Sequence, residues 1–305
     1  MFFITPNSLF SKNWSSVKIK SKLFIPKIIR FINKYFYKIG LFGAILNRYD
    51  NSVTFYSASK DKKLYKNYSK DSKFINFGSG AFNHPFWINY DYPGQSNYYK
   101  KLQGDKEIDF YPINLCKDNL KIHFEDNSCD LIYCSHTLEH LEEEKGFNFL
   151  KECQRILKKN AIMRVALPST ENNFYYAKLI YNQEKISQKI KDEVILDCAN
   201  KLFSETENLP NEFVIKKVIE SNFSIQNFIE ILAKENNLSL KFKEESPERH
   251  ITYYSHEKLI DISKKLNFQF YTPLYKGSSF ADPFKNLEVF DTTEPQWSIY
   301  GEFIK

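Results

Sequence analysis

The chain has 305 residues, of which 42% are hydrophobic, and a net charge of +6. Its length and apolar content fit one large domain with appended segments and exclude a small disulfide-rich scaffold. Its five cysteines show no CxxC or Cys/His ligand spacing, which predicts reduced thiols, a cytoplasmic protein and no metal site. No apolar run approaches the roughly 20 residues that a membrane span requires.

The positive charge is concentrated in residues 1–70, which we interpret as a basic N-terminal extension. They contain 14 Lys/Arg and 2 Asp/Glu, a net charge of +12, so residues 71–305 carry −6. Apolar residues recur at helical spacing from Ile25 to Leu41, with basic residues on the opposite face. The favoured interpretation is a helix packed on its own domain. The alternative is peripheral docking of residues 25–41 on the anionic inner surface of a membrane. Polar residues 57–72 predict a linker.

From Lys73 onward, short apolar runs alternate with helical stretches, which predicts an α/β domain with a doubly wound parallel sheet. Residues 71–169 form its predicted cofactor-binding core. The strands expected there are 74–77, 87–91, 108–113, 130–134 and 161–167. Before the last of these we expect a helix whose buried stripe is Phe147, Leu150, Cys153, Ile156 and Leu157.

Residues 170–249 interrupt this alternation. They consist mostly of polar helical pieces, such as 183–203 and 211–235, and predict a helical insertion that forms a lid over the carboxyl edge of the sheet. The alternation resumes in residues 250–305, the predicted C-terminal part of the sheet. The elements expected there are a helix over 255–266 and strands over 268–275 and 298–304.

A glycine turn and an acidic residue indicate a nucleotide-type ligand. Gly78-Ser79-Gly80 follows the first core strand, where absent side chains let a ligand approach the backbone. Asp91 ends the next strand, where a carboxylate can accept hydrogen bonds from two ribose hydroxyls. The structural alternatives are a plain turn and a capping carboxylate. No third glycine follows Gly80, and the short connection leaves little helix for a pyrophosphate, so S-adenosylmethionine is favoured over NAD.

Three segments of the core carry recognisable motifs: 76–80, 87–91 and 124–141, the last with Asp-Leu-Ile-Tyr at 130–133 and Leu-Glu-His-Leu at 138–141. They resemble class I S-adenosylmethionine-dependent methyltransferases, and most strongly a type 11-like group associated with bacterial surface-glycan pathways. Residues 152–168 and 298–303 are similar to later elements of that family. The resemblance implies a Rossmann-like seven-stranded sheet whose last strand is antiparallel.

The resemblance also implies a cofactor site. The cofactor-binding residues that it implies are Phe77, Gly78, Ser79, Gly80, Asp91, Tyr92, Asn114, Leu115 and Ser135. The glycine turn would face the methionine moiety, Asp91 the ribose and Tyr92 the adenine. Asn114 stands where the family usually has Asp, and its carbonyl oxygen can still accept a hydrogen bond from an exocyclic amine. Ser135 would lie near the methyl group.

His136 and Glu139 are the candidate catalytic residues. An unperturbed histidine pKa near ~6.5 suits a general base for a hydroxyl acceptor. The alternative is that His136 only shapes the pocket. Glu139 is expected to orient His136, whereas His140 is expected to be a structural partner at the helix start. His250 is expected to lie in a surface loop, and the alternative is that it lines the acceptor pocket.

The predicted function is methyl transfer from S-adenosylmethionine to oxygen or nitrogen of a small-molecule or glycan-linked acceptor, in surface polysaccharide or related biosynthesis. One alternative is a catalytically degenerate binding or assembly protein, which Asn114 and the missing third glycine motivate. Another is a nucleic-acid methyltransferase, which the basic extension suggests. Ser135-His136 stands where a base-flipping Asn/Asp-Pro-Pro-Tyr/Phe motif would follow the strand, so a nucleic-acid partner is disfavoured.

Overall fold

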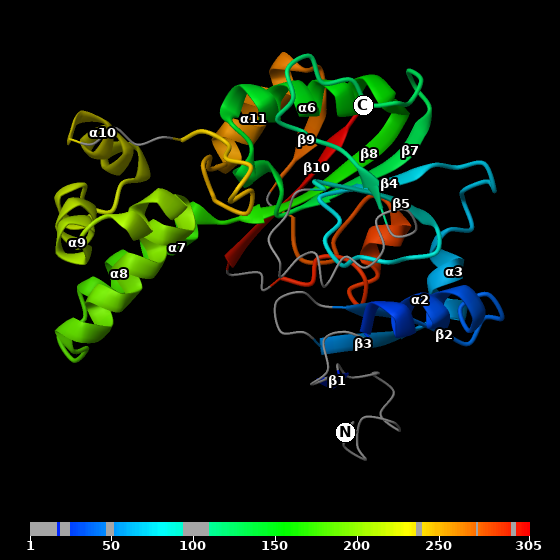
Figure 1. Cartoon of the computed structure of the whole chain (residues 1–305), viewed down its shortest axis with the longest axis horizontal. Coiled ribbons are helices and arrows are strands. Elements are labelled where there is room, and N and C mark those ends of the chain that lie inside the picture. The colour runs from blue at the N-terminus through cyan, green and yellow to red at the C-terminus, as the bar shows by residue number, and fades with distance from the viewer. Residues whose placement is uncertain are drawn as a thin grey trace.

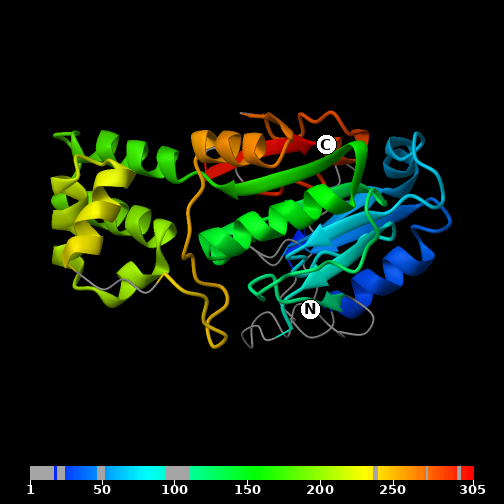
Figure 2. The same ribbon diagram turned by 90° about the horizontal axis from the view of Figure 1, so that it is seen from above.

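The computed structural model describes residues 17–18, 25–46, 52–93, 110–235, 240–272, 274–293 and 297–305. A mixed β-sheet forms the centre of the molecule, with helices on one face and an N-terminal layer on the other (Figure 1). A group of helices projects from one side of the sheet, as the view from above also shows (Figure 2).

In the described part of the chain the central sheet has seven strands, in the order β6-β5-β4-β7-β8-β10-β9. The strands are β4 (Phe74–Phe77), β5 (Trp87–Asp91), β6 (Tyr111–Pro112), β7 (Cys129–Ser135), β8 (Leu157–Pro168), β9 (Gln269–Tyr271) and β10 (Ser298–Ile304). The first five are parallel, and β10 is antiparallel to both β8 and β9. The predicted Rossmann-like sheet with an antiparallel last strand is therefore confirmed. Residues 108–109 of the third predicted strand lie outside the described residues.

Two helices cover one face of the sheet, α6 (Glu143–Ile156) and α11 (His256–Lys265). The predicted stripe of α6 is buried at Leu150, Cys153 and Ile156, and Leu157 is buried at the start of β8. The expectation for Phe147 is wrong, because Phe149 is the fully buried ring and Phe147 only packs against the edge of the core.

The N-terminal region covers the opposite face of the sheet. Its elements are β1 (Val17–Lys18), α2 (Ile25–Tyr35), β2 (Phe42–Leu46), β3 (Ser52–Ser57) and α3 (Ala58–Leu64), with the strands in a three-stranded sheet of order β1-β3-β2. The polar linker predicted over residues 57–72 is therefore wrong, since α3 begins at Ala58. Its N-cap is Ser57, whose side chain accepts a hydrogen bond from Lys60 N–H.

The apolar side of α2 packs within the chain itself. Ile25, Ile29 and Ile32 are buried in a cluster that also contains residues of β2 and β3. This confirms the favoured interpretation of the amphipathic pattern and leaves membrane docking by that apolar face without support. Among the described residues, no helix combines the length and the hydropathy that crossing a bilayer would require.

A buried polar network joins the N-terminal layer to the rest of the molecule. The Asp61 carboxylate accepts hydrogen bonds from the Tyr37 hydroxyl at 2.7 Å and from Asn286 Nδ2 at 2.6 Å. His84 Nε2, from the loop after the glycine turn, lies 3.0 Å from the same carboxylate. One side chain of α3 therefore links three segments that are far apart in sequence.

A second buried network fixes the segment before β10. Arg164 of β8 is fully buried, and its guanidinium pairs with Asp291 at 2.6 Å and with Glu302 at 3.4 Å. It also donates to the Ser278 carbonyl oxygen at 2.7 Å. The long connection to β10, which includes the short 3₁₀ helix Asp282–Lys285, is thereby held on the face of the sheet.

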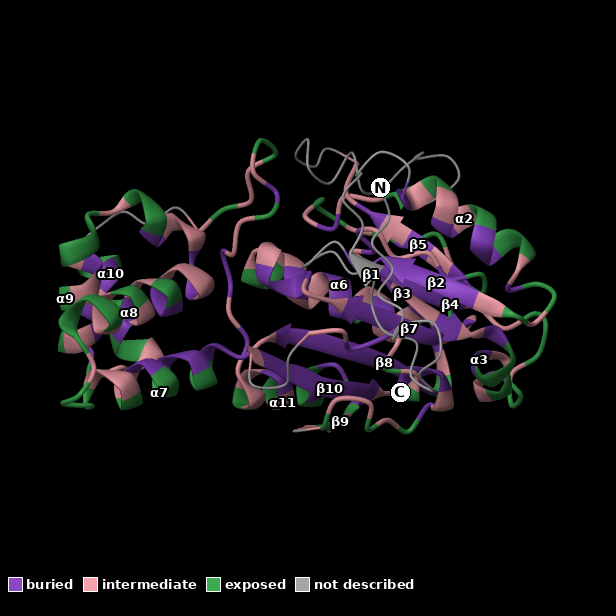
Figure 3. Cartoon of the chain, turned by 90° about the horizontal axis from the view of Figure 1, so that it is seen from below, coloured by how far each residue is buried: buried purple, intermediate pink, exposed green. Residues whose placement is uncertain are grey.

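The insertion after β8 is helical, as expected, and has a hydrophobic core of its own. Its helices are α7 (Thr170–Tyr181), α8 (Gln188–Leu202), α9 (Asn211–Glu220) and α10 (Ile225–Glu235), with a 3₁₀ helix over Ser204–Asn208. They project beside the sheet, with buried residues facing one another (Figure 3). The expected lid position is wrong for these helices, because their apolar faces pack together rather than on the sheet. The returning segment, described over residues 240–255, runs between these helices and the central sheet (Figure 2).

Candidate active site

A cavity of about 660 Å³ opens beyond the carboxyl ends of β4, β5 and β7. The predicted site residues that line it are Gly78, Gly80, Asp91, Tyr92, Asn114, Leu115 and His136. The returning segment of the insertion contributes Phe242, Pro247 and Glu248, and among the described residues α7 to α10 contribute none.

The turn after β4 requires glycine at Gly78. Gly78 has φ +67°, and a Cβ placed there would lie 1.9 Å from Thr137 Oγ1. The Gly78 N–H donates to the Tyr90 carbonyl oxygen at 2.9 Å, which closes the turn against β5. Gly80 also has a positive φ, +54°. The backbone is therefore exposed to the cavity without side chains in front of it.

The carboxylate of Asp91 lies at this turn, as predicted. It is buried at the cavity wall, where Oδ2 accepts from Gly80 N–H at 2.6 Å and Oδ1 accepts from Tyr92 N–H at 2.7 Å. Two backbone donors thus fix the orientation of a charged acceptor beside the glycine turn. That placement fits the ribose of an adenosyl group.

Part of the cavity wall is apolar and aromatic. The rings of Tyr92 and Phe242 meet edge to face with centroids 5.3 Å apart, and Ile113 and Leu115 line the wall beside them. Such a surface suits a flat heteroaromatic base. Asn114 lines the cavity too, but its Oδ1 accepts a hydrogen bond from Cys116 N–H at 2.9 Å. The amide therefore stabilises its own turn.

Three predicted cofactor residues do not line this cavity. Phe77 is fully buried against Phe149 of α6, with ring centroids 5.1 Å apart, because its side chain points to the helical face of the sheet. Ser79 and Ser135 line a second cavity of about 490 Å³ on the opposite side of Gly78, which borders both spaces. Successive side chains of a strand point to opposite faces, so the positions of Ser79 and Ser135 in the turn and in β7 decide which cavity they line. The sequence motif alone does not specify this.

The second cavity lies under the N-terminal layer. Ile45 of β2 and Val289 of the C-terminal connection form part of its wall, and Asn76 and Ser135 contribute polar groups. The Ser79 hydroxyl is buried and accepts or donates no hydrogen bond within the described residues. The N-terminal layer therefore helps to form a small polar chamber beside the glycine turn.

His136 and Glu139 contact each other at the end of β7. His136 has a left-handed backbone, with φ +50°, and its Nδ1 lies 3.2 Å from Glu139 Oε1. Burial alone would raise the pKa of the Glu139 carboxyl, but the hydrogen bond from His136 and the charges of the nearby imidazoles lower it to about 2. Glu139 is therefore ionised and positioned to orient His136. The Nε2 atom of His136 is buried in this structure.

His140 and His250 lie beside the same carboxylate, and the expected surface position of His250 is wrong. His140 lines the larger cavity, and its ring centroid is 5.0 Å from that of His250. His250 is half-buried rather than at a surface, because Ile251 N–H and Thr252 N–H both donate to the Glu139 carbonyl oxygen, at 2.9 and 3.1 Å. Sequence reasoning missed this contact, since no local pattern relates two residues so distant in the chain.

Residues 89–165 match a family model described as a methyltransferase domain. The matched stretch runs from β5 into β8 and includes Asp91 and His136, whereas the glycine turn lies before it. The match supports a class I S-adenosylmethionine-dependent methyltransferase and S-adenosylmethionine as the cofactor. None of the curated proteins matches the chain.

Several solved structures match the chain at low identity and low TM-score. A SAM-dependent methyltransferase from Aquifex aeolicus is 12% identical with a TM-score of 0.33, over 92% of this chain and 97% of that one. One from Mesorhizobium loti is 8% identical with a TM-score of 0.37, over 80% and 96% of the two chains. One from Archaeoglobus fulgidus is 13% identical with a TM-score of 0.37, over 81% and 92%. Scores this low assign no activity to this chain.

Proposed function

We propose that this chain transfers a methyl group from S-adenosylmethionine to oxygen or nitrogen of a small-molecule or glycan-linked acceptor, in surface polysaccharide or related biosynthesis. The observation that carries the proposal is the Asp91 carboxylate, which accepts a hydrogen bond from the glycine turn at the wall of the cavity. The methyltransferase-domain match over residues 89–165 agrees with it. The glycan pathway rests on the sequence resemblance.

The residues that would hold the cofactor follow from the cavity wall. When bound, S-adenosylmethionine supplies an electrophilic methyl group on a sulfonium. Asp91 would accept hydrogen bonds from the ribose, and Tyr92, Leu115 and Phe242 would enclose the adenine. The glycine turn would lie against the methionine moiety. Rigid positioning of this kind supplies up to ~7–11 kcal/mol of a displacement barrier in favourable systems.

The reacting group of the acceptor would lie beside His136 in the first cavity, which meets the second cavity at Gly78. The Ser79 and Ser135 side chains, which line the second cavity, offer hydroxyl groups that would orient a polar part of the acceptor. This arrangement favours a compact acceptor over duplex nucleic acid.

His136 is the proposed proton acceptor for a hydroxyl substrate. Its Nδ1 faces the Glu139 carboxylate, which fixes the ring tautomer and leaves Nε2 as the basic nitrogen. Because Nε2 is buried here, this role requires the groups that cover Nε2 to move when the acceptor binds, while the contact between Nδ1 and Glu139 is kept. The carboxylate of Glu139 would act as a positioning group for the imidazole.

Calorimetry with S-adenosylhomocysteine tests the cofactor site. The wild-type chain should bind it with one site, and Asp91→Asn should weaken binding roughly 10- to 100-fold, since a charged acceptor contributes about 1.5–3 kcal/mol. Asp71→Asn changes an exposed carboxylate outside the cavity and should bind like the wild type.

Absence of wild-type binding would refute the enzyme proposal. Binding without methyl transfer to any sugar-nucleotide or oligosaccharide fraction, measured with a labelled methyl group, would favour the degenerate binding protein. Turnover on such a fraction, lost in His136→Asn with S-adenosylhomocysteine affinity retained, would support the proposed role of His136.

A further inference from the structure

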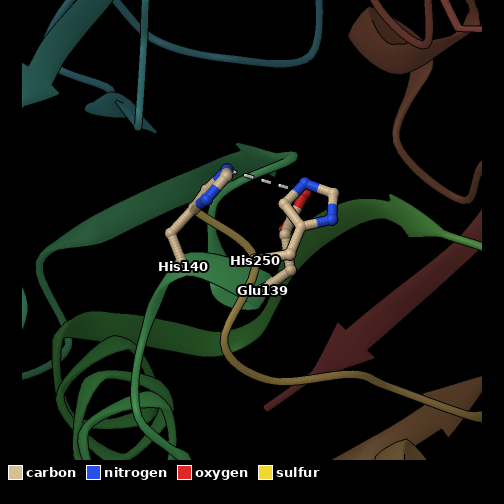
Figure 4. Close-up of side chains that lie close together, drawn as sticks. All are labelled: Glu139, His140 and His250. Atoms are coloured by element: carbon tan, nitrogen blue, oxygen red, sulfur yellow. Dashed lines mark ion pairs between the residues drawn. The ribbon is translucent and has the colours of Figure 1, made fainter. Parts of the chain in front are cut away.

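A second feature beside the active site is a cluster of one carboxylate and two imidazoles. Glu139, His140 and His250 each present a ligand atom, and these atoms lie within 4.8 Å of one another. Figure 4 shows the three side chains converging, with the ion pair between Glu139 and His140 dashed. Glu139 and His140 come from the turn after β7, whereas His250 comes from the segment that returns from the helical insertion.

The hydrogen bonds behind the two imidazoles define their tautomers. His140 Nδ1 lies 3.0 Å from the Arg249 carbonyl oxygen, and His250 Nδ1 lies 2.7 Å from the Lys201 carbonyl oxygen. A carbonyl oxygen only accepts, so Nδ1 of each ring carries the hydrogen. In a neutral ring Nε2 is then the nitrogen with the lone pair. Histidine ligands of metals commonly have such a carbonyl partner on the second nitrogen.

The carboxylate in the middle of the cluster is buried. Glu139 is 2% exposed, and its Oε2 receives no hydrogen bond from the described residues. His140 Nε2 lies 3.9 Å from Oε1. A positive charge beside this buried carboxylate balances it, and either a proton on an imidazole or a metal ion held between the three ligand atoms supplies that charge.

We propose that Glu139, His140 and His250 bind a divalent transition-metal ion, for which Zn²⁺ is the test ion. Two imidazoles and one carboxylate are the ligand set of catalytic zinc sites that keep a position open for water or substrate. Imidazole ligands favour zinc and neighbouring metals over magnesium or calcium. With Zn–N and Zn–O bonds of about 2.0–2.2 Å, the side chains need to close by about an ångström.

The location gives such an ion a structural consequence. His140 lines the larger cavity, and His250 belongs to the segment that contributes Phe242, Pro247 and Glu248 to that cavity wall. The same segment is held to the insertion by the ion pair between Arg249 and Glu205. A bound ion would therefore tie the returning segment to the turn after β7 and fix one wall of the proposed cofactor site.

Calorimetry with Zn²⁺ on the full chain, treated with chelator and dialysed, tests the proposal. The wild type should bind one Zn²⁺ per chain, and the ion should raise its Tm through binding to the folded state. His250→Ala and the nearly isosteric Glu139→Gln should each weaken binding by at least about 10- to 100-fold and abolish the Tm shift. His256→Ala, a histidine of α11 that contacts Glu171 outside the cluster, should bind as the wild type does.

The opposite results overturn the proposal. They are a wild type that binds no Zn²⁺, or Zn²⁺ binding that persists in both ligand variants because the ion sits elsewhere. Circular dichroism verifies that each variant is folded. If His250→Ala does not fold, the Zn²⁺ binding of Glu139→Gln alone decides the test. S-adenosylhomocysteine titrations of the same samples keep the two proposals separate, since loss of cofactor binding with intact Zn²⁺ binding refutes only the proposed function.

Discussion

Gly78 meets two independent requirements of the proposed site. Its φ of +67° costs an ordinary L-residue about 1–2 kcal/mol, and the space for a Cβ is filled by Thr137. Both requirements arise because the chain turns sharply between β4 and the Asp91 carboxylate. The glycine motif predicted this turn, while the contact with Thr137 emerges from the packing of β7 beside β4.

Gly78→Ala should lower both stability and affinity for S-adenosylhomocysteine, the latter by at least about tenfold, because the turn must move away from Thr137. Gly40→Ala is the matched control, since Gly40 has φ +83° with no atom within 4 Å of a Cβ and lies outside the cavity. It should lose about 1–2 kcal/mol and keep the affinity. Calorimetry and urea denaturation measure the two effects, and equal affinities would contradict the placement of the turn.

Local motifs predicted only part of the group formed by His136, Glu139, His140 and His250. The pairing of His136 with Glu139 followed from their spacing on one turn. The approach of His250 depends on how the returning segment bonds to the Glu139 carbonyl oxygen, which is a long-range event. The expectation that the chain holds no metal site considered cysteines and local spacing, and it could not include that approach.

Among the elements, the core strands were the most predictable. The predicted ranges 74–77 and 87–91 agree with β4 and β5, because buried parallel strands form short continuous apolar runs. The strand predicted over 268–275 is shorter, as β9 ends at Tyr271. Among the described strands β9 lies at the sheet edge and pairs with β10 alone, so it has fewer backbone hydrogen bonds to extend it.

Strand β8 carries a buried arginine that its apolar pattern did not explain. Arg164→Met should destabilise the fold by about 3–5 kcal/mol, because Asp291 and Glu302 are then left buried without their cation. Lys216→Met removes an exposed i,i+4 pair with Glu220 and should leave stability unchanged. Urea denaturation compares the two. A fold that tolerates Arg164→Met would show that the network does not hold the segment before β10.

In the molecule as a whole, the N-terminal layer is part of the fold rather than an appendage. The carboxylate of Asp61, in α3 of the N-terminal extension, contacts Tyr37 of the same extension and His84 of the loop after the glycine turn. Asn286, in the long connection to β10, donates a hydrogen bond to the same carboxylate. Burial alone would raise the pKa of Asp61, but its hydrogen bonds and the charge of His84 outweigh that and lower it. The ionised form therefore stabilises the fold.

The stabilisation by Asp61 should depend on pH. A carboxyl with a lowered folded-state pKa contributes fully above its unfolded pKa, near ~3.9, and the contribution is lost as pH falls toward the folded value. Asp61→Asn should therefore unfold at lower urea concentration than the wild type at pH 7, with a smaller difference at pH 3. A difference that is independent of pH would show that Asp61 does not act through its charge.

Local patterns along the chain were enough to specify the parallel sheet, the glycine turn, the position of Asp91 and a helical insertion, because each depends on side-chain periodicity or on a few neighbouring residues. Packing in three dimensions settled the rest. It turned Ser79 and Ser135 to a second cavity, placed the N-terminal layer on one face of the sheet and brought His250 to Glu139. These contacts join residues far apart in sequence, and their formation depends on how whole faces of elements fit together.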